Sequence, residues 1–276
     1  MLKRIKGLKD ALWALAIGAA LLLLFVGFLI AAFTPYRGDR DRPVMDLRAG
    51  QEQSSAPAGD DSQAQTAALQ PDGTLHSLAE TADAGQSYLD GLCYLLDSSL
   101  INLRGTGLVN GQIWSSESGT LSMSITGEWN IRYPGDSSFI SPASAASVKK
   151  PAVLVIGVGS DGLLGLSKDA FVTNYVSLIR SLADASPDTR IICLSLCSVT
   201  ASYAGMDGLS KDAVAEINGW IRTVCTETGA YYADLSGVLY DDGYLKSEYA
   251  DGSGRCLNSA GLRELLQYLR THSLQS

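Results

Sequence analysis

Histidine is the scarcest residue for acid–base chemistry in this chain, since 276 residues include only His76 and His272. A metal site built on histidines is therefore not expected. Basic residues are also few, with 21 Lys and Arg against 29 Asp and Glu and a formal net charge of −8. Nucleic acid binding needs clustered positive charge, so this balance argues against nucleic acid as a partner. Five cysteines in a chain of this length do not make a disulfide scaffold.

The N-terminal region contains one long apolar run. Residues 11–33 include no charged side chain, and a helix of that length extends roughly 34 Å, enough to cross a bilayer. A cleaved signal peptide would have a shorter apolar core and a small-x-small cleavage site, which the following residues lack. Four Lys or Arg residues precede the run and three follow it. We therefore predict an uncleaved single-pass membrane anchor, with residues 1–10 in the cytoplasm and the C-terminal bulk of the chain outside.

The next segment has the composition of a tether. Between residues 49 and 74 the sequence consists mainly of Gln, Ser, Ala, Asp, Gly and Pro, and Leu69 is the only large apolar residue. Such a segment cannot bury enough apolar surface to offset the entropy lost on ordering. The sequence thus predicts a disordered stalk over 34–85, followed by one folded domain over 86–276.

Strand-like and helix-like patterns alternate along that domain. Apolar runs at 92–96, 152–158, 191–196 and 230–235 are typical of buried strands. Helical patterns follow Ser167, begin near Ser210 and end at Gly229, and follow Asn258 or Ser259. This alternation predicts an α/β fold with a parallel sheet covered on both faces. Ligands in such folds bind at the carboxyl ends of the strands.

Two short motifs invite other interpretations. Residues 157–162 fit the dinucleotide-binding pattern G-x-G-x-x-G, but the next helix begins only near Lys168 and the following strand ends without an acid to hold a ribose. We interpret this segment as a glycine-rich turn and expect no cofactor. Residues 135–138 include a literal G-D-S, yet they follow Tyr133 and Pro134 and are typical of a surface turn.

Three blocks of the sequence resemble the SGNH, or GDSL, hydrolase superfamily. Residues 88–98, YLDGLCYLLDS, are similar to its first block, Y-x-D-x-x-L-F-I-G-D-S, with Leu96 at the motif glycine. Residues 152–182 resemble its third block, and residues 228–272 its ending, which contains D-G-x-H-L-N. The resemblance extends over 86–276 and implies a flavodoxin-like three-layer α/β/α fold. It also implies esterase or O-deacetylase chemistry, in which a serine attacks an acyl carbonyl and a histidine oriented by an aspartate takes its proton.

Carried over position by position, the resemblance assigns a site with several substitutions. Ser98 stands at the nucleophile, and Gly119 at the glycine of the oxyanion hole. The histidine is replaced by Cys256 and its orienting aspartate by Ser253. The asparagine of the oxyanion hole is replaced by Gly159, Ser160 or Asp161, depending on the register.

These substitutions favour a catalytically degenerate domain. Cys256 is a poor general base, since a thiol has a pKa near 8.5, although the neighbouring Arg255 could lower it. We therefore predict a membrane-anchored domain that binds a cell-envelope ligand, such as a glycan or an acyl group, or a partner. The alternative is an active serine esterase or O-deacetylase that uses Ser98 on acylated cell-envelope glycans or lipids.

Overall fold

The computed structural model describes residues 69, 71–135, 138–203, 205 and 207–274. The chain divides into two units, Met1–Asp61 and Ser62–Ser276, and all described residues belong to the second. The predicted anchor at 11–33 and the predicted stalk up to residue 68 lie outside the described residues. Within the described part of the chain, no helix is long and apolar enough to cross a membrane.

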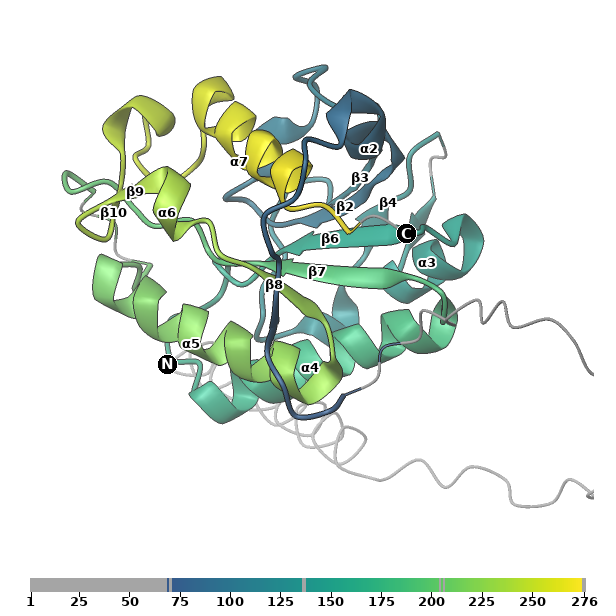
Figure 1. Cartoon of the computed structure of the whole chain (residues 1–276). Coiled ribbons are helices and arrows are strands. Elements are labelled where there is room, and N and C mark those ends of the chain that lie inside the picture. Colours follow the sequence, from purple (N-terminus) through teal and green to yellow (C-terminus); the bar gives the residue numbers. More distant parts are fainter. Residues whose placement is uncertain (1–68, 70, 136–137, 204, 206, 275–276) are drawn as a thin grey trace, which may run out of the picture. The chain divides into compact units, whose positions relative to one another are not determined.

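A six-stranded parallel sheet forms the centre of the second unit (Figure 1). Its order is β1-β8-β7-β6-β2-β3. Without β1, the order in the sheet is that of a flavodoxin-like fold. The four predicted strands are confirmed as β2, β6, β7 and β8. The bounds are β1 (His76–Ser77), β2 (Cys93–Leu96), β3 (Gln112–Trp114), β6 (Val153–Gly157), β7 (Arg190–Leu194) and β8 (Tyr231–Ala233).

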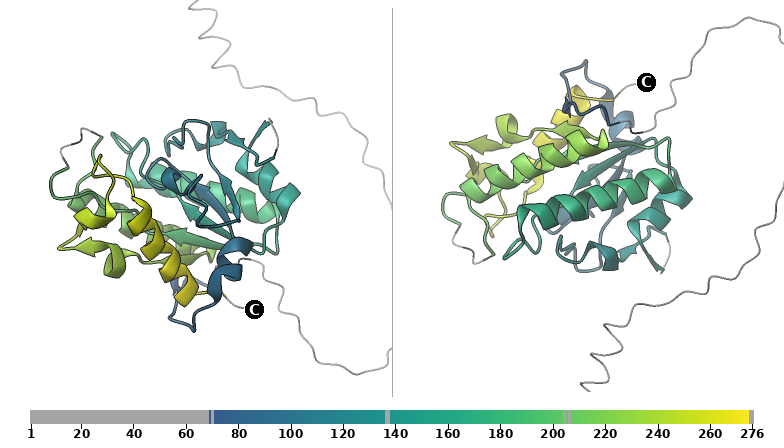
Figure 2. Two further views of the ribbon diagram at one scale, coloured as in Figure 1. Left: turned by 90° about the horizontal axis from the view of Figure 1, so that it is seen from above. Right: turned by 90° about the horizontal axis from the view of Figure 1, so that it is seen from below.

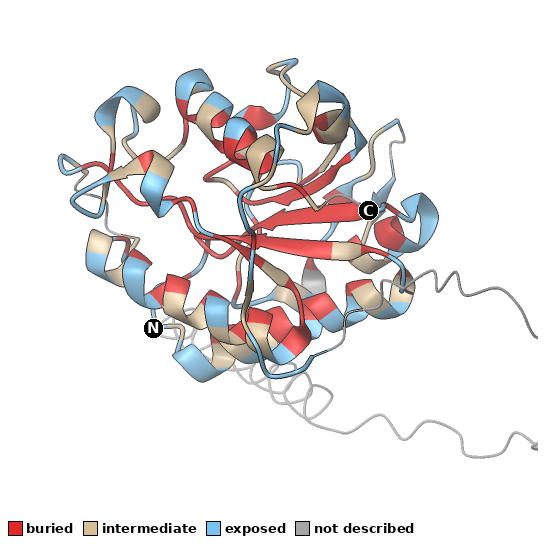
Figure 3. Cartoon of the chain, viewed as in Figure 1, coloured by how far each residue is buried: buried red, intermediate tan, exposed pale blue. Residues whose placement is uncertain are grey.

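Helices cover both faces of the sheet (Figure 2), so the predicted three-layer α/β/α arrangement is confirmed. One face packs against α3 (Pro142–Lys149), α4 (Lys168–Ala185) and α5 (Lys211–Thr228), and the other against α2 (Gly85–Gly91), α6 (Ser236–Leu239) and α7 (Ser259–Thr271). Alternate residues of a strand serve the two faces: Cys93 and Leu95 join the first core cluster, whereas Tyr94 and Leu96 join the second. The strands are therefore buried on both sides (Figure 3).

Side-chain caps set the starts of the three helices that the sequence predicts. Ser167 accepts a hydrogen bond from Ala170 N at the start of α4, and Ser210 accepts one from Ala213 N at the start of α5. Asn258 caps α7 by accepting from two backbone N–H groups. These bonds satisfy donors that a helix leaves free at its first turn.

Short elements complete the unit. Two antiparallel pairs lie outside the main sheet, and the second turns through Asp242 and Gly243, both at positive φ, as a tight hairpin requires. Three single 3₁₀ turns interrupt the loops. The bounds are β4 (Ile131–Arg132), β5 (Phe139–Ile140), β9 (Tyr240–Asp241), β10 (Tyr244–Leu245), η1 (Ile101–Leu103), η2 (Thr126–Glu128) and η3 (Ser247–Tyr249).

The segment before α2 belongs to the folded domain, although its composition assigns it to the stalk. β1 pairs in parallel with β8, and Leu78 N donates to Tyr232 O at 2.9 Å. Further along, Thr81 N donates to the carbonyl of Thr271 at the end of α7. Leu78 itself is buried in the second core cluster. The domain thus begins before residue 86. The segment is polar on average, but backbone hydrogen bonds and buried Leu78 attach it to β8 and α7.

We expect Leu78→Ala to lower the free energy of unfolding by about 2 kcal/mol, since the leucine is only 9% exposed and its truncation leaves a cavity. Val148, which is 67% exposed, provides the control, and Val148→Ala should change stability by about 0.5 kcal/mol or less. Urea unfolding of both variants measures the difference. Equal, small effects would mean that this segment does not contribute to the core.

Candidate active site

The candidate site lies where the strand order of the sheet reverses. β2 is followed in the chain by β3 on one side of it and by β6 on the other. Ser98 comes two residues after the end of β2, and Asp161 lies in the turn that follows β6. Crevices at such a reversal, at the carboxyl ends of parallel strands, are the usual ligand sites of open α/β sheets.

Asp97 joins the ends of β2 and β6. Its side chain is fully buried and accepts five hydrogen bonds. Oδ1 accepts from the backbone N and the hydroxyl of Ser99, and Oδ2 from Gly159 N at 3.0 Å and from Ser160 N and Oγ, both at 2.8 Å. Burial raises the pKa of Asp97 and the charge of Asp161 adds to the rise, while these hydrogen bonds oppose it. The residue is a structural tie between two loops.

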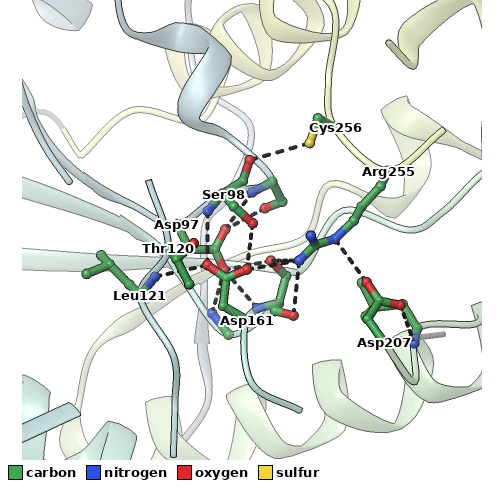
Figure 4. A network of polar contacts seen from close by, with 12 residues as sticks. Asp97, Ser98, Thr120, Leu121, Asp161, Asp207, Arg255 and Cys256 are labelled. Atoms are coloured by element: carbon green, nitrogen blue, oxygen red, sulfur yellow. Dashed lines mark hydrogen bonds and ion pairs between the residues drawn. The ribbon is translucent and has the colours of Figure 1, made fainter. Parts of the chain in front are cut away.

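The turn after β6 presents Asp161 to Ser98. Gly159 in this turn has φ of +125°, a backbone conformation that side chains rarely adopt, and a Cβ there would approach the Phe171 ring at 3.1 Å. Beyond it, Asp161 Oδ1 accepts the Ser98 hydroxyl at 2.5 Å. Asp161 Oδ2 accepts Ser98 N at 3.2 Å and Leu121 N at 2.9 Å. Figure 4 shows these contacts converging on one carboxylate.

Leu121, and not Gly119, supplies the backbone donor from the loop after β3. Gly119 N donates to Ser116 O, within its own loop. The same loop is fixed a second time where Met123 N donates to the backbone carbonyl of Asp161. Leu121 lies two residues beyond the predicted Gly119. Its N–H and the N–H of Ser98 therefore donate to the same oxygen, Asp161 Oδ2. The resemblance assigns this role to Gly119, because the sequence alone does not show which N–H of the loop turns toward the site.

Arg255 neutralises the carboxylate of Asp161. Its Nη2 donates to Asp161 Oδ1 at 2.9 Å, and its Nε lies 3.3 Å from Asp207 Oδ2. Asp207 in turn accepts the Tyr203 hydroxyl at 2.8 Å. Burial opposes the charge of Arg255, but the hydrogen bond and the charge of Asp161 outweigh it and raise the pKa of Arg255. Nothing in the sequence indicated the partners of Arg255, because Asp161 and Asp207 are distant from it along the chain.

Cys256 lies beside Ser98, as the alignment predicts, but it cannot act as its base. The Cys256 thiol donates to the backbone carbonyl of Ser98, with Sγ and O 3.4 Å apart. Burial raises the pKa of Cys256, and Asp251 raises it further, so the lowering effect of Arg255 does not prevail. Ser253 Oγ donates to Asp251 Oδ1, and a hydrogen bond with Ser253 lowers the pKa of Cys256 without cancelling the rise.

Neither histidine is near Ser98. His76 lies on β1, which three strands separate from β2, and it contacts Asp72. His272 follows α7 and stacks on the Tyr268 ring, with centroids 4.0 Å apart. The Ser98 hydroxyl therefore has a carboxylate as its hydrogen-bond partner where esterases of this type have an imidazole.

The glycine-rich turn at 157–162 makes hydrogen bonds within the protein. The backbone N–H groups of Gly159 and Ser160 donate to Asp97, and α4 begins only at Lys168. Among the residues that the structure describes, no cluster of three His, Cys, Asp or Glu side chains could hold a metal ion.

A sequence model of the GDSL-like lipase/acylhydrolase family matches residues 109–264. The chain belongs to this family. The match begins downstream of Ser98 and includes the loops that carry Leu121, Asp161 and Arg255. The comparison with curated proteins gives no match.

Solved structures with a similar fold include a Streptococcus pneumonia protein named after platelet activating factor. It is 17% identical, the alignment covers 70% of this chain and 84% of that chain, and the TM-score is 0.48. A family 3 carbohydrate esterase from Clostridium thermocellum is 12% identical, with 66% and 94% of the two chains covered and a TM-score of 0.40. A carbohydrate esterase family 3 protein from Talaromyces cellulolyticus is 15% identical, with 59% and 67% covered and a TM-score of 0.37.

We expect Asp97→Asn to lower the free energy of unfolding by about 1–3 kcal/mol, because an amide nitrogen cannot accept the backbone N–H groups that face the carboxylate. Asp188, an exposed residue in the turn before β7, provides the matched control. Chemical unfolding at pH 7 should show little change for Asp188→Asn. A similar stability of both variants would contradict the role of Asp97 as a tie.

Proposed function

We propose that this chain is a non-hydrolysing member of the GDSL-like family, and that its cleft serves binding and not turnover. One observation carries the proposal: Asp161 Oδ2 accepts both Ser98 N and Leu121 N, the two backbone donors that an oxyanion would need. A carboxylate held there repels the negative charge that develops on an acyl carbonyl during attack. An active site arranged in this way opposes its own transition state.

The proton transfer is also unsupported. Asp161 Oδ1 accepts the Ser98 hydroxyl, but the same oxygen accepts Arg255 Nη2. That oxygen is already shared with the guanidinium, whereas a general base needs a free acceptor aimed at the proton that it takes. Loss of one triad function alone lowers turnover by about 10⁴-fold in a serine hydrolase. Here the imidazole and the free oxyanion hole are missing together.

A polar cavity beside the site supports the binding role. It has a volume of about 420 Å³ and is lined mainly by hydroxyl-bearing residues and Asp251 from the loops after β7 and before α7. Its walls include Ser253 and Gly254, which directly precede Arg255. We infer that the cleft holds a cell-envelope ligand, a glycan or an acylated compound, or a protein partner. Residues 11–33 would anchor the domain, with its N-terminus in the cytoplasm and the cleft outside the membrane.

We expect the full-length protein and Ser98→Ala to hydrolyse p-nitrophenyl acetate at the same background rate, because no group completes the chemistry of Ser98. The hydroxyl should also fail to react with a fluorophosphonate probe. A rate that falls in Ser98→Ala, or labelling of Ser98, would instead establish the alternative, an active esterase or O-deacetylase with Ser98 as nucleophile.

We expect the domain to be digested when protease is added outside spheroplasts of bacteria that produce the full-length chain. The reason is the apolar run at 11–33, which places the C-terminal bulk of the chain outside. The matched control lacks residues 11–33 and should resist external protease until the cells are lysed. Resistance of the full-length chain in intact spheroplasts would contradict the proposed orientation.

A further inference from the structure

Four donors from three separate loops converge on the carboxylate of Asp161. Ser98 N and Leu121 N reach Oδ2, and Ser98 Oγ and Arg255 Nη2 reach Oδ1. The side chain of Asp161 is only 5% exposed. Backbone N–H groups and a guanidinium that surround a buried carboxylate have the composition of an anion-binding site. The occupant in this case is covalently part of the protein.

The carboxylates around the site disfavour the binding of a second anion by electrostatic repulsion. Arg255 already faces two carboxylates, Asp161 and Asp207, and the buried Asp97 lies on the other side of the turn. An external carboxylate would meet repulsion from these groups and would find the donors in use. With Asp161 in place, the hole is therefore closed both electrostatically and by hydrogen bonding.

We propose that Ser98, Leu121 and Arg255 form a binding site for small carboxylates that Asp161 occupies as an internal ligand, so that Asp161 determines the ligand specificity of the cleft. With Asp161 present, the donors of Ser98, Leu121 and Arg255 are unavailable to an anion or an acyl carbonyl, and a ligand binds in the neighbouring polar cavity without them. Without its carboxylate, the hole accepts formate or acetate in the same place. This inference rests on the proposed binding function, because it describes recognition in a cleft that performs no turnover.

The test is chemical rescue of Asp161→Ala in the full-length protein. The substitution removes the carboxylate and leaves both backbone donors and the guanidinium in place, so formate has the charge and the size of the missing group. We expect added sodium formate to raise the melting temperature of Asp161→Ala by roughly 5 °C once its concentration is about 100 times Kd. Acetate should act more weakly, because its methyl group has to share space with the remaining Cβ.

Asp207→Ala is the matched control. It removes the other carboxylate that faces Arg255 but leaves Asp161 in the hole. Sodium formate should shift the melting temperatures of Asp207→Ala and of the wild type by the same amount. That shift should equal the one produced by sodium chloride at the same concentration. In the double variant Asp161→Ala/Arg255→Met, formate should bind at least about tenfold more weakly, since the charged donor is gone.

The readout is the formate-dependent change in the folded fraction, so it remains decisive if Asp161→Ala is partly unfolded in buffer. Restoration of the far-ultraviolet circular dichroism by formate supports the internal-ligand role. A response of Asp161→Ala no larger than that of Asp207→Ala overturns it. Esterase activity of the wild type would refute the proposed function without affecting this comparison, because the rescue experiment measures binding alone.

Discussion

The hydrogen bonds of the buried Asp97 carboxylate hold the ends of β2 and β6 in one arrangement, and the site depends on that arrangement. Oδ1 binds the loop that carries Ser98, and Oδ2 binds the turn that carries Asp161. The distance between Ser98 Oγ and Asp161 Oδ1 is thus a consequence of two loops fixed to one side chain. The tie lies deep in the sheet, where a donor without an acceptor would cost the full penalty of desolvation.

A second buried carboxylate so close to the first requires a counter-ion, and the chain supplies it from the loop before α7. Arg255 occupies the space beside Asp161 next to Cys256, where the resemblance places the catalytic histidine. The loss of the imidazole and the gain of the ion pair are therefore linked in space. If the proposed function holds, a histidine introduced at position 256 does not by itself give activity, because Asp161 still accepts Ser98 N and Leu121 N.

The fold could be predicted from local patterns, but the site only partly. Apolar runs identified β2, β6, β7 and β8, and the caps at Ser167, Ser210 and Asn258 were visible as residue types at helix starts. Ser98, Asp161 and Cys256 could be brought together by alignment. The roles of Leu121 and Arg255 could not be predicted by alignment, because they depend on which loops the fold brings into contact with Asp161. The short strand β1 was missed since its segment is polar on average.

The N-terminal edge of the described domain is distant from the site within the sheet. The first described strand, β1, lies at the far edge of the sheet, and β8, β7 and β6 stand between it and β2. A pull on the N-terminal segment would load the few bonds to β8 and to the end of α7 first. These bonds lie three strands away from β2, so none of the contacts that hold Asp161 beside Ser98 depends on them directly.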